Sequence, residues 1–226
     1  MSQSGPSLRS RSLWAKREAR CLAILERALL LLRMRSSLPE AEVDLNRLLY
    51  SCLLRASREL YPSEEVSPVQ ECNNQPDLDD KGRAAREQKR PDFQWIYLDR
   101  YEGNPDRSSR QFVVECKRLG KSGRADWVLN SNYVNHGICR FWKPEWAYAK
   151  RFSSGAMVGY CQSMEAEAIL VEVNCELRRN SLPNITPREK RKDVGVSGLE
   201  HQFERPFPIS PFRLIHLWVA IRSGTG

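Results

Sequence analysis

Apolar residues recur every three or four positions along the first sixty residues of the chain, which is the spacing of amphipathic helices. This spacing predicts a first helix over residues 12–35, ended by Ser36, Ser37 and Pro39. A second helix is predicted from about Pro39 to Leu60, because Pro39 suits a first helical turn and the acidic residues after it suit the positive end of the helix dipole. The buried side predicted for this helix consists of Val43, Leu45, Leu48, Leu49, Leu53 and Leu54.

The pattern changes from helical to β beyond residue 61. Residues 61–90 are rich in Pro, Asp, Asn, Glu and Arg, so we expect a long polar surface loop with room for one short helical turn. The segment "DFQWIYL" (92–98) is aromatic and alternating, and "QFVVECKRL" (111–119) is β-rich, with a polar turn between them. These two segments are predicted to form a β-hairpin.

The second half of the chain alternates between helical and β-rich segments. The prediction is helices over 126–142 and 163–180, strands over 155–161 and 213–221, and a loop over 183–198. This order of elements predicts an α/β fold in which helices flank a mixed central sheet. We expect one globular domain over residues 39–226, preceded by an N-terminal helical extension over residues 1–38.

Composition adds a preference for an acidic partner. Of the 226 residues, 36 are Lys or Arg and 28 are Asp or Glu, and the formal charge of +8 favours a polyanion such as nucleic acid. The seven cysteines contain no CxxC pair, which favours reduced thiols in a cytoplasmic protein over disulfides or zinc. The most apolar run, residues 21–32, is interrupted by Glu26 and Arg27 and is too short to span a bilayer, so no membrane partner is expected.

Candidate chemistry lies on the predicted hairpin. Glu115 and Lys117 are two positions apart on one strand and therefore point to the same face, and Asp92 begins the strand before it. An antiparallel hairpin brings Asp92 beside Glu115, so two carboxylates and an ammonium group converge. Alternatively, Asp92 is a turn residue after Pro91, and Glu115 with Lys117 is an exposed ion pair contributing under about 1 kcal/mol.

The converging groups suit metal-dependent phosphodiester hydrolysis. Asp92 and Glu115 are candidate ligands for Mg²⁺, for which Mn²⁺ can substitute, because this hard cation prefers oxygen ligands. The metal would polarise the scissile phosphate and lower the pKa of a bound water. Lys117 would orient the attacking water or stabilise the charge that develops on the phosphate.

The pair Pro91-Asp92, followed by Glu115-Cys116-Lys117, resembles the motif of the PD-(D/E)XK nuclease superfamily, which has the restriction-endonuclease-like fold. The resemblance implies an αβββαβ core, and downstream segments such as "GAMVGYCQS" look like uncharacterised bacterial relatives. It also implies that a glutamate on the first core helix completes the metal site. The matching position is Glu42, with Glu40 and Asp44 as rivals.

Basic and aromatic residues provide candidates for contact with nucleic acid. Basic clusters flank the site on both sides and suit a non-specific grip on phosphates; the candidates are Lys89, Arg90, Arg118, Lys121 and Arg124. Seven aromatic residues either stack on bases or belong to the core, with the core favoured: Trp95, Tyr97, Trp127, Tyr133, Trp142, Trp146 and Tyr148.

Three further positions have both a functional and a structural interpretation, and two histidines have only a structural one. Gln162 either reaches the active-site edge or caps a strand end, and His201 with Arg205 either contacts phosphate or lies in an ordinary surface loop. His136 and His216 are predicted to be structural.

The sequence therefore predicts a cytoplasmic Mg²⁺-dependent nuclease, with DNA as the favoured substrate and bacterial defence or DNA processing as the role implied by resemblance. The catalytic residues would be Asp92, Glu115, Lys117 and Glu42, and the metal ligands Asp92, Glu115 and Glu42. The alternative is a non-catalytic nucleic-acid-binding or assembly subunit that retains the fold, and an RNA-directed nuclease would share the same site. A homo-oligomer or a partner protein would supply or restrain the activity.

Overall fold

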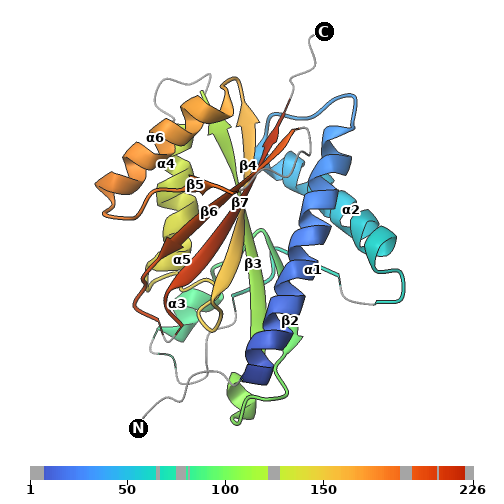
Figure 1. Ribbon diagram of the computed structural model, residues 1–226, viewed down its shortest axis with the longest axis vertical. Helices are drawn as coiled ribbons and strands as arrows, with labels where there is room; N and C mark the ends of the chain where they lie inside the picture. The colour runs from blue at the N-terminus through green and yellow to red at the C-terminus, as the bar shows by residue number, and fades with distance from the viewer. Residues whose placement is uncertain are drawn as a thin grey trace.

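The computed structural model describes residues 8–64, 67–74, 80, 82–121, 128–188, 195–207 and 209–221. It is an α/β structure with a seven-stranded mixed sheet. Helices α1 and α2 cover one side of the sheet, and α4, α5 and α6 lie on the other (Figure 1). The predicted α/β class is confirmed at this level.

Helices α1 (Leu8–Arg33) and α2 (Glu42–Leu60) pack against each other and against the sheet. The prediction that Pro39 opens the second helix is wrong, because Ala41 has extended backbone angles and the helix begins at Glu42. Val43 and Leu54 are also exposed rather than buried. The helical period places other residues on the buried side of α2, which consists of Leu45, Asn46, Leu49, Cys52, Leu53 and Ala56.

The sheet has the strand order β1-β2-β3-β4-β7-β6-β5. Its antiparallel first half consists of β1 (Val69–Gln70), β2 (Phe93–Leu98) and β3 (Ser109–Gly120), with the 3₁₀ turn η1 (Pro105–Arg107) between the last two. Strands β3, β4 (Ser154–Gln162) and β7 (Phe212–Ala220) run parallel to one another in the centre. The predicted hairpin is therefore confirmed, and its second strand is a central one.

The predicted helix over 126–142 is interrupted. Residues 126 and 127 lie outside the described part, and the rest forms α4 (Leu129–Tyr133), a π-helical turn η2 (Val134–Ile138) and α5 (Cys139–Trp142). The predicted helix over 163–180 is α6 (Ala166–Arg179), and the loop over 61–90 contains one short helix, α3 (Arg83–Glu87). A single wide turn thus separates α4 from α5.

The loop predicted over 183–198 is wrong in part. It contains the short strand β5 (Thr186–Pro187) and the start of β6 (Val196–Phe203), although residues 189–194 lie outside the described part. Both strands pair antiparallel at the far side of β7. In β6 the buried residues alternate with more exposed ones, so the strand shows the period of two expected for an outer strand.

The core lies on both faces of the sheet. Strands β3 and β4 are buried along most of their length, as central strands covered by helices should be. Trp95, Tyr97, Tyr133 and Tyr148 belong to this core, whereas Trp142 and Trp146 are half-buried and Trp127 lies outside the described residues. All seven cysteines are described, and none forms a disulfide.

A search of the described helices finds none that combines the length and the apolar character needed to cross a membrane.

Candidate active site

Asp92 is held at the start of β2 by two hydrogen bonds. The pairing of Phe93 with Val114 places Asp92 beside Glu115 across the hairpin. The backbone N–H of Cys116 donates to Asp92 Oδ2 at 2.7 Å, and Asn46 Nδ2 of helix α2 donates to Oδ1 at 3.0 Å. The carboxylate of Asp92 is thus oriented by both the neighbouring strand and the covering helix.

Glu115 and Lys117 contact each other on one face of β3, as their spacing predicts. Lys117 Nζ lies 3.0 Å from Glu115 Oε1. The side chain of Glu115 is fully buried and that of Lys117 is only 12 % exposed. The alternative of an exposed ion pair is therefore wrong, because this pair lies within the folded interior.

Arg140 of helix α5 is a second cation on Glu115, and the sequence pattern gives no indication of it. Its NH1 group donates to the same Oε1 atom that Lys117 contacts. Its guanidinium carbon lies 4.3 Å from the ring centroid of Trp146. Only the packing of α5 against β3 brings Arg140 to this carboxylate, so nothing in its local sequence distinguishes it from other surface arginines.

Of the three acidic residues around the start of α2, Glu42 is the one whose carboxylate reaches the cluster. Glu42 Oε1 lies 2.7 Å from Lys117 Nζ, and Oε2 accepts the backbone N–H of Arg118 at 3.1 Å. Asp44 instead forms an exposed ion pair with Arg47. Glu40 contributes its backbone carbonyl, which accepts from Gln162 Nε2 at 3.0 Å.

Burial and charge act together on the ionisable groups of this cluster. Loss of hydration raises the pKa of Asp92 and of Glu115, and the charge of Glu115 raises the pKa of Asp92 further. Burial alone would lower the pKa of Lys117, but the charges of the three surrounding carboxylates outweigh it and raise that pKa. The cluster thus contains three carboxyl groups and two basic side chains, those of Lys117 and Arg140.

Among the described residues, the present side-chain positions bring together no group of three His, Cys, Asp or Glu side chains that could hold a metal ion. The donor chemistry nonetheless fits a hard divalent cation, because Asp92, Glu115 and Glu42 supply only carboxylate oxygens. Glu115 Oε2 is also buried without a hydrogen-bond partner among the described residues. A buried, unpaired carboxylate oxygen is costly unless a cation or donor satisfies it.

The candidate residues for nucleic-acid contact have different surroundings. Lys89 Nζ lies 4.3 Å from the ring centroid of Trp146, which connects it to Arg140. Arg90 is exposed and donates to Asn73 Oδ1 at 3.0 Å, and Lys121 is exposed at the end of β3. Arg118 lies beside Lys117 at the cluster, whereas Arg124 is outside the described residues.

The remaining candidates are away from the carboxylates. His201 is buried on β6 instead of lying in a surface loop, and burial lowers its pKa to about 4. Arg205 is also buried, donates to backbone carbonyls including Tyr148 O at 3.1 Å, and lies 3.8 Å from the ring centroid of Phe212. It is therefore a structural arginine.

His216 is structural as predicted, because its ring nitrogen Nδ1 lies 2.7 Å from the Tyr133 hydroxyl. His136, in contrast, is exposed.

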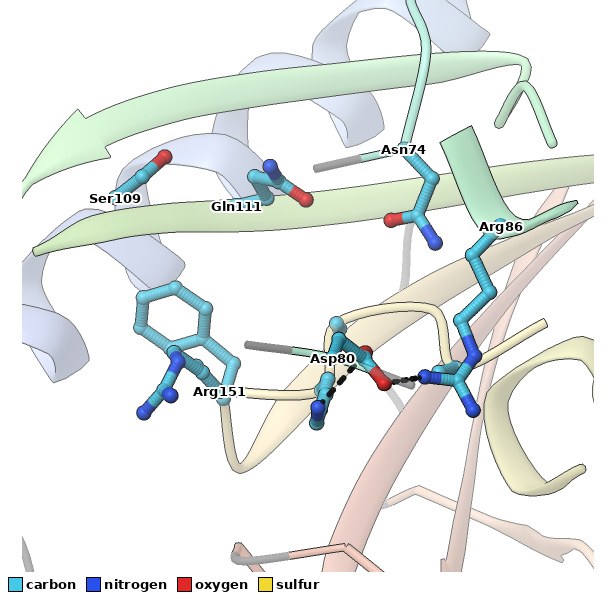
Figure 2. Close-up of a pocket in the computed structure, with 10 residues that line it drawn as sticks. Asn74, Asp80, Arg86, Ser109, Gln111 and Arg151 are labelled. Carbon is cyan, nitrogen blue, oxygen red and sulfur yellow. Dashed lines mark hydrogen bonds and ion pairs between the residues drawn. The ribbon is translucent and has the colours of Figure 1, made fainter. Parts of the chain in front are cut away.

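A separate polar pocket lies beside the first half of β3, lined by Ser109 and Gln111 among others (Figure 2). Asp80 contacts both Arg86 and Lys150 there, the latter at 2.9 Å. None of the four predicted catalytic residues lines this pocket. Its charged groups already pair with one another, so its residues form a structural ion-pair network rather than part of the candidate site.

No protein-family model matches the chain, and neither the curated proteins nor the solved structures contain a match. Function therefore has to be inferred from the site itself.

Proposed function

We propose that the protein is a Mg²⁺-dependent nuclease with a restriction-endonuclease-like fold, acting on DNA. The observation that supports this most is the meeting of Asp92, Glu115 and Lys117 with Glu42, which comes from a separate helix. Glu115 and Lys117 lie on the central strand β3, where buried charges without a function would be costly. A cluster of this kind is expected where it serves chemistry.

The order and pairing of the elements also support the proposal. Helix α2 is followed by the antiparallel strands β1, β2 and β3, with the short helix α3 between β1 and β2, then by the helical segment from α4 to α5, and then by β4. Strand β4 lies parallel to β3. This order is compatible with the helix, three-strand meander, helix and further strand that the superfamily resemblance implies for the core, and it supports the proposal in that respect.

Each site residue has a role that its surroundings suit. Asp92, Glu115 and Glu42 would hold the divalent cation, which when bound would polarise the scissile phosphate and lower the pKa of a bound water. Lys117 remains charged among the carboxylates and would stabilise negative charge on the phosphate or orient the attacking water. Lys89, Arg90, Arg118 and Lys121 would hold the flanking phosphates.

A second candidate function is a non-catalytic nucleic-acid-binding or assembly subunit with the same fold. The observation that favours it is the existing pairing of the carboxylates, since Lys117 and Arg140 both contact Glu115. In such a subunit these ion pairs would serve only to stabilise strand β3 and to hold helix α5 against it. An RNA-directed nuclease would use the same residues as the DNA nuclease and differ only in the substrate it cleaves.

The test is cleavage of supercoiled plasmid, single-stranded DNA and RNA with Mg²⁺ or Mn²⁺, with an EDTA control. We expect the wild type to cut DNA and expect Asp92→Ala and Lys117→Ala to lose at least about a hundredfold in rate, since each loses electrostatic stabilisation in a buried site. Asp44→Ala is the matched control, because its carboxylate is on the same helix as Glu42 but pairs only on the surface. Equal activity of all four proteins would exclude this site as the catalytic one, and absence of cleavage with DNA binding intact would favour the subunit.

A further inference from the structure

Arg140 is placed between the buried carboxylate of Glu115 and the surface. Its side chain is 19 % exposed, whereas that of Glu115 is fully buried. Its NH1 donates to Glu115 Oε1, and its Nε has no hydrogen-bond partner among the described residues. The guanidinium group therefore uses only part of its hydrogen-bonding capacity on the carboxylate, although arginine can hold oxyanions through two parallel bonds.

Contacts through Trp146 connect Arg140 to Lys89, one of the candidate residues for nucleic-acid contact. Both Arg140 and Lys89 lie over the ring of Trp146, each 4.3 Å from its centroid. Trp146 is half-buried and also packs edge-on against Tyr148, with 5.8 Å between the ring centroids. The aromatic ring attracts the charge of the Arg140 guanidinium without fixing that group to one oxygen.

We propose that Arg140 is a substrate-binding residue that exchanges partners, an inference that rests on the proposed function. Without a divalent cation, Arg140 holds Glu115 Oε1. Once the cation binds Glu115, the guanidinium leaves the carboxylate and binds a non-bridging oxygen of the nucleic-acid backbone beside the scissile phosphate.

The charge balance of the site supports this exchange. Lys117 and Arg140 already place two positive groups on Oε1 of Glu115, the first at 3.0 Å. A divalent cation held by the same carboxylate would add a third positive group, and its repulsion of Arg140 would favour transfer of the guanidinium to a backbone phosphate. Arg140 and the cation would compete for the carboxylate of Glu115, whose Oε1 accepts from Arg140 and whose Oε2 has no hydrogen-bond partner among the described residues, whereas Arg140 and the phosphate attract each other.

The exchange predicts opposite effects of Arg140 on metal binding and on DNA binding. We expect Arg140→Gln to bind Mn²⁺ about tenfold more tightly than the wild type in calorimetric titration, because a charged hydrogen bond no longer competes for Glu115. With Ca²⁺ present, fluorescence anisotropy should show that Arg140→Gln binds a short DNA duplex about tenfold more weakly, whereas in EDTA the two proteins should bind DNA equally. Arg140→Lys, which keeps the charge but lacks the fork of donors, should fall between wild type and Arg140→Gln in both measurements.

Two controls separate the possible failures. Arg179→Gln removes an exposed arginine that also pairs with a glutamate, and it should change neither measurement. Glu115→Gln should abolish the Mn²⁺ binding of the wild type and of Arg140→Gln. If Mn²⁺ binding does not depend on Glu115 in either protein, the proposed metal site itself is overturned. If it depends on Glu115 but Arg140→Gln and Arg140→Lys bind Mn²⁺ no more tightly than the wild type, only the exchange of partners is overturned.

Discussion

Asn46 illustrates how a single polar residue on an apolar helix face orients the candidate site. It is buried on α2 among leucines, donates to Asp92 Oδ1 at 3.0 Å, and accepts from the Tyr160 hydroxyl at 2.8 Å. An asparagine at this helical position is visible in the sequence as a polar interruption of the buried side. Its partners are not, because Asp92 and Tyr160 come from strands much later in the chain.

Replacing Asn46 should therefore affect both stability and activity. We expect Asn46→Leu to lower the free energy of unfolding by about 1–3 kcal/mol, because it leaves the Tyr160 hydroxyl and one Asp92 oxygen buried without partners. Urea unfolding of Asn46→Leu and of the double variant Asn46→Leu/Tyr160→Phe measures this cost. The double variant should recover part of the loss, since the orphaned hydroxyl is gone. No recovery would mean that the unpaired Tyr160 hydroxyl contributes nothing to the cost.

At the scale of elements, the helices and strands with a regular spacing of apolar residues could be predicted from the sequence. Elements whose burial depends on pairing with another strand could not. The two long helices and the hairpin follow from spacing, as does the position of Glu115 and Lys117 on one face. Strand β6 was missed because its apolar residues alternate with Glu200 and Gln202 directly after a basic segment. Only its pairing with β7 shows that Leu199, His201 and Phe203 are buried.

Strands β6 and β7 bring two buried histidines together, and this pair should shape the acid stability of the fold. The ring centroids of His201 and His216 are 5.8 Å apart. Burial lowers the pKa of His201 to about 4 and that of His216 well below its ordinary value, and the two charges also disfavour each other. The unfolded chain therefore takes up protons near pH 6.5 while the folded protein does not, so stability falls as the pH drops from about 6.5 to about 4.

The variant His201→Phe should reduce this acid loss of stability by up to about 3 kcal/mol, which corresponds to its lowered pKa. Urea midpoints measured between pH 7.5 and 4.5 give the slope for each protein. The exposed His136 is the matched control, and His136→Gln should follow the wild type throughout. If the urea midpoints of wild type and His201→Phe fall in parallel as the pH is lowered, groups other than His201 cause the loss of stability in acid.

At the scale of the whole molecule, the central parallel strands position the site, and the order of strands could not be derived from the sequence. Strand β3 lies between β2 and β4, and Glu115 pairs with Met157 of β4 just beyond the point where the pairing with β2 ends, so that Asp92 lies beside it. Arg140 reaches Glu115 only because the chain crosses from β3 to the parallel strand β4 through α4 and α5. Local patterns therefore found the residues supplied by the hairpin and α2, and missed the one supplied by the crossover.

A further question about the whole molecule is whether α1 unfolds independently, as an extension, or together with the sheet. Trp14 is buried, stacks on Phe152 with 3.4 Å between ring centroids, and donates to Ser154 Oγ at 3.3 Å, while Glu18 pairs with Arg213 at the start of β7. These contacts tie α1 to the starts of two central strands. We expect Trp14→Ala to lower the free energy of unfolding of the whole chain by about 3–5 kcal/mol in a single transition, because it opens a cavity in a shared core.

Circular dichroism of the entire chain during urea unfolding tests this, with the exposed Lys16→Ala on the same helix as the matched control. Lys16→Ala should unfold at the wild-type midpoint. A Trp14→Ala protein that loses one helix early while the sheet keeps its wild-type midpoint would instead identify α1 as an independent extension. In that case the site, which depends on α2 and β3, should keep its activity after α1 has detached. Loss of activity in step with the single transition is the result expected if α1 and the sheet unfold together.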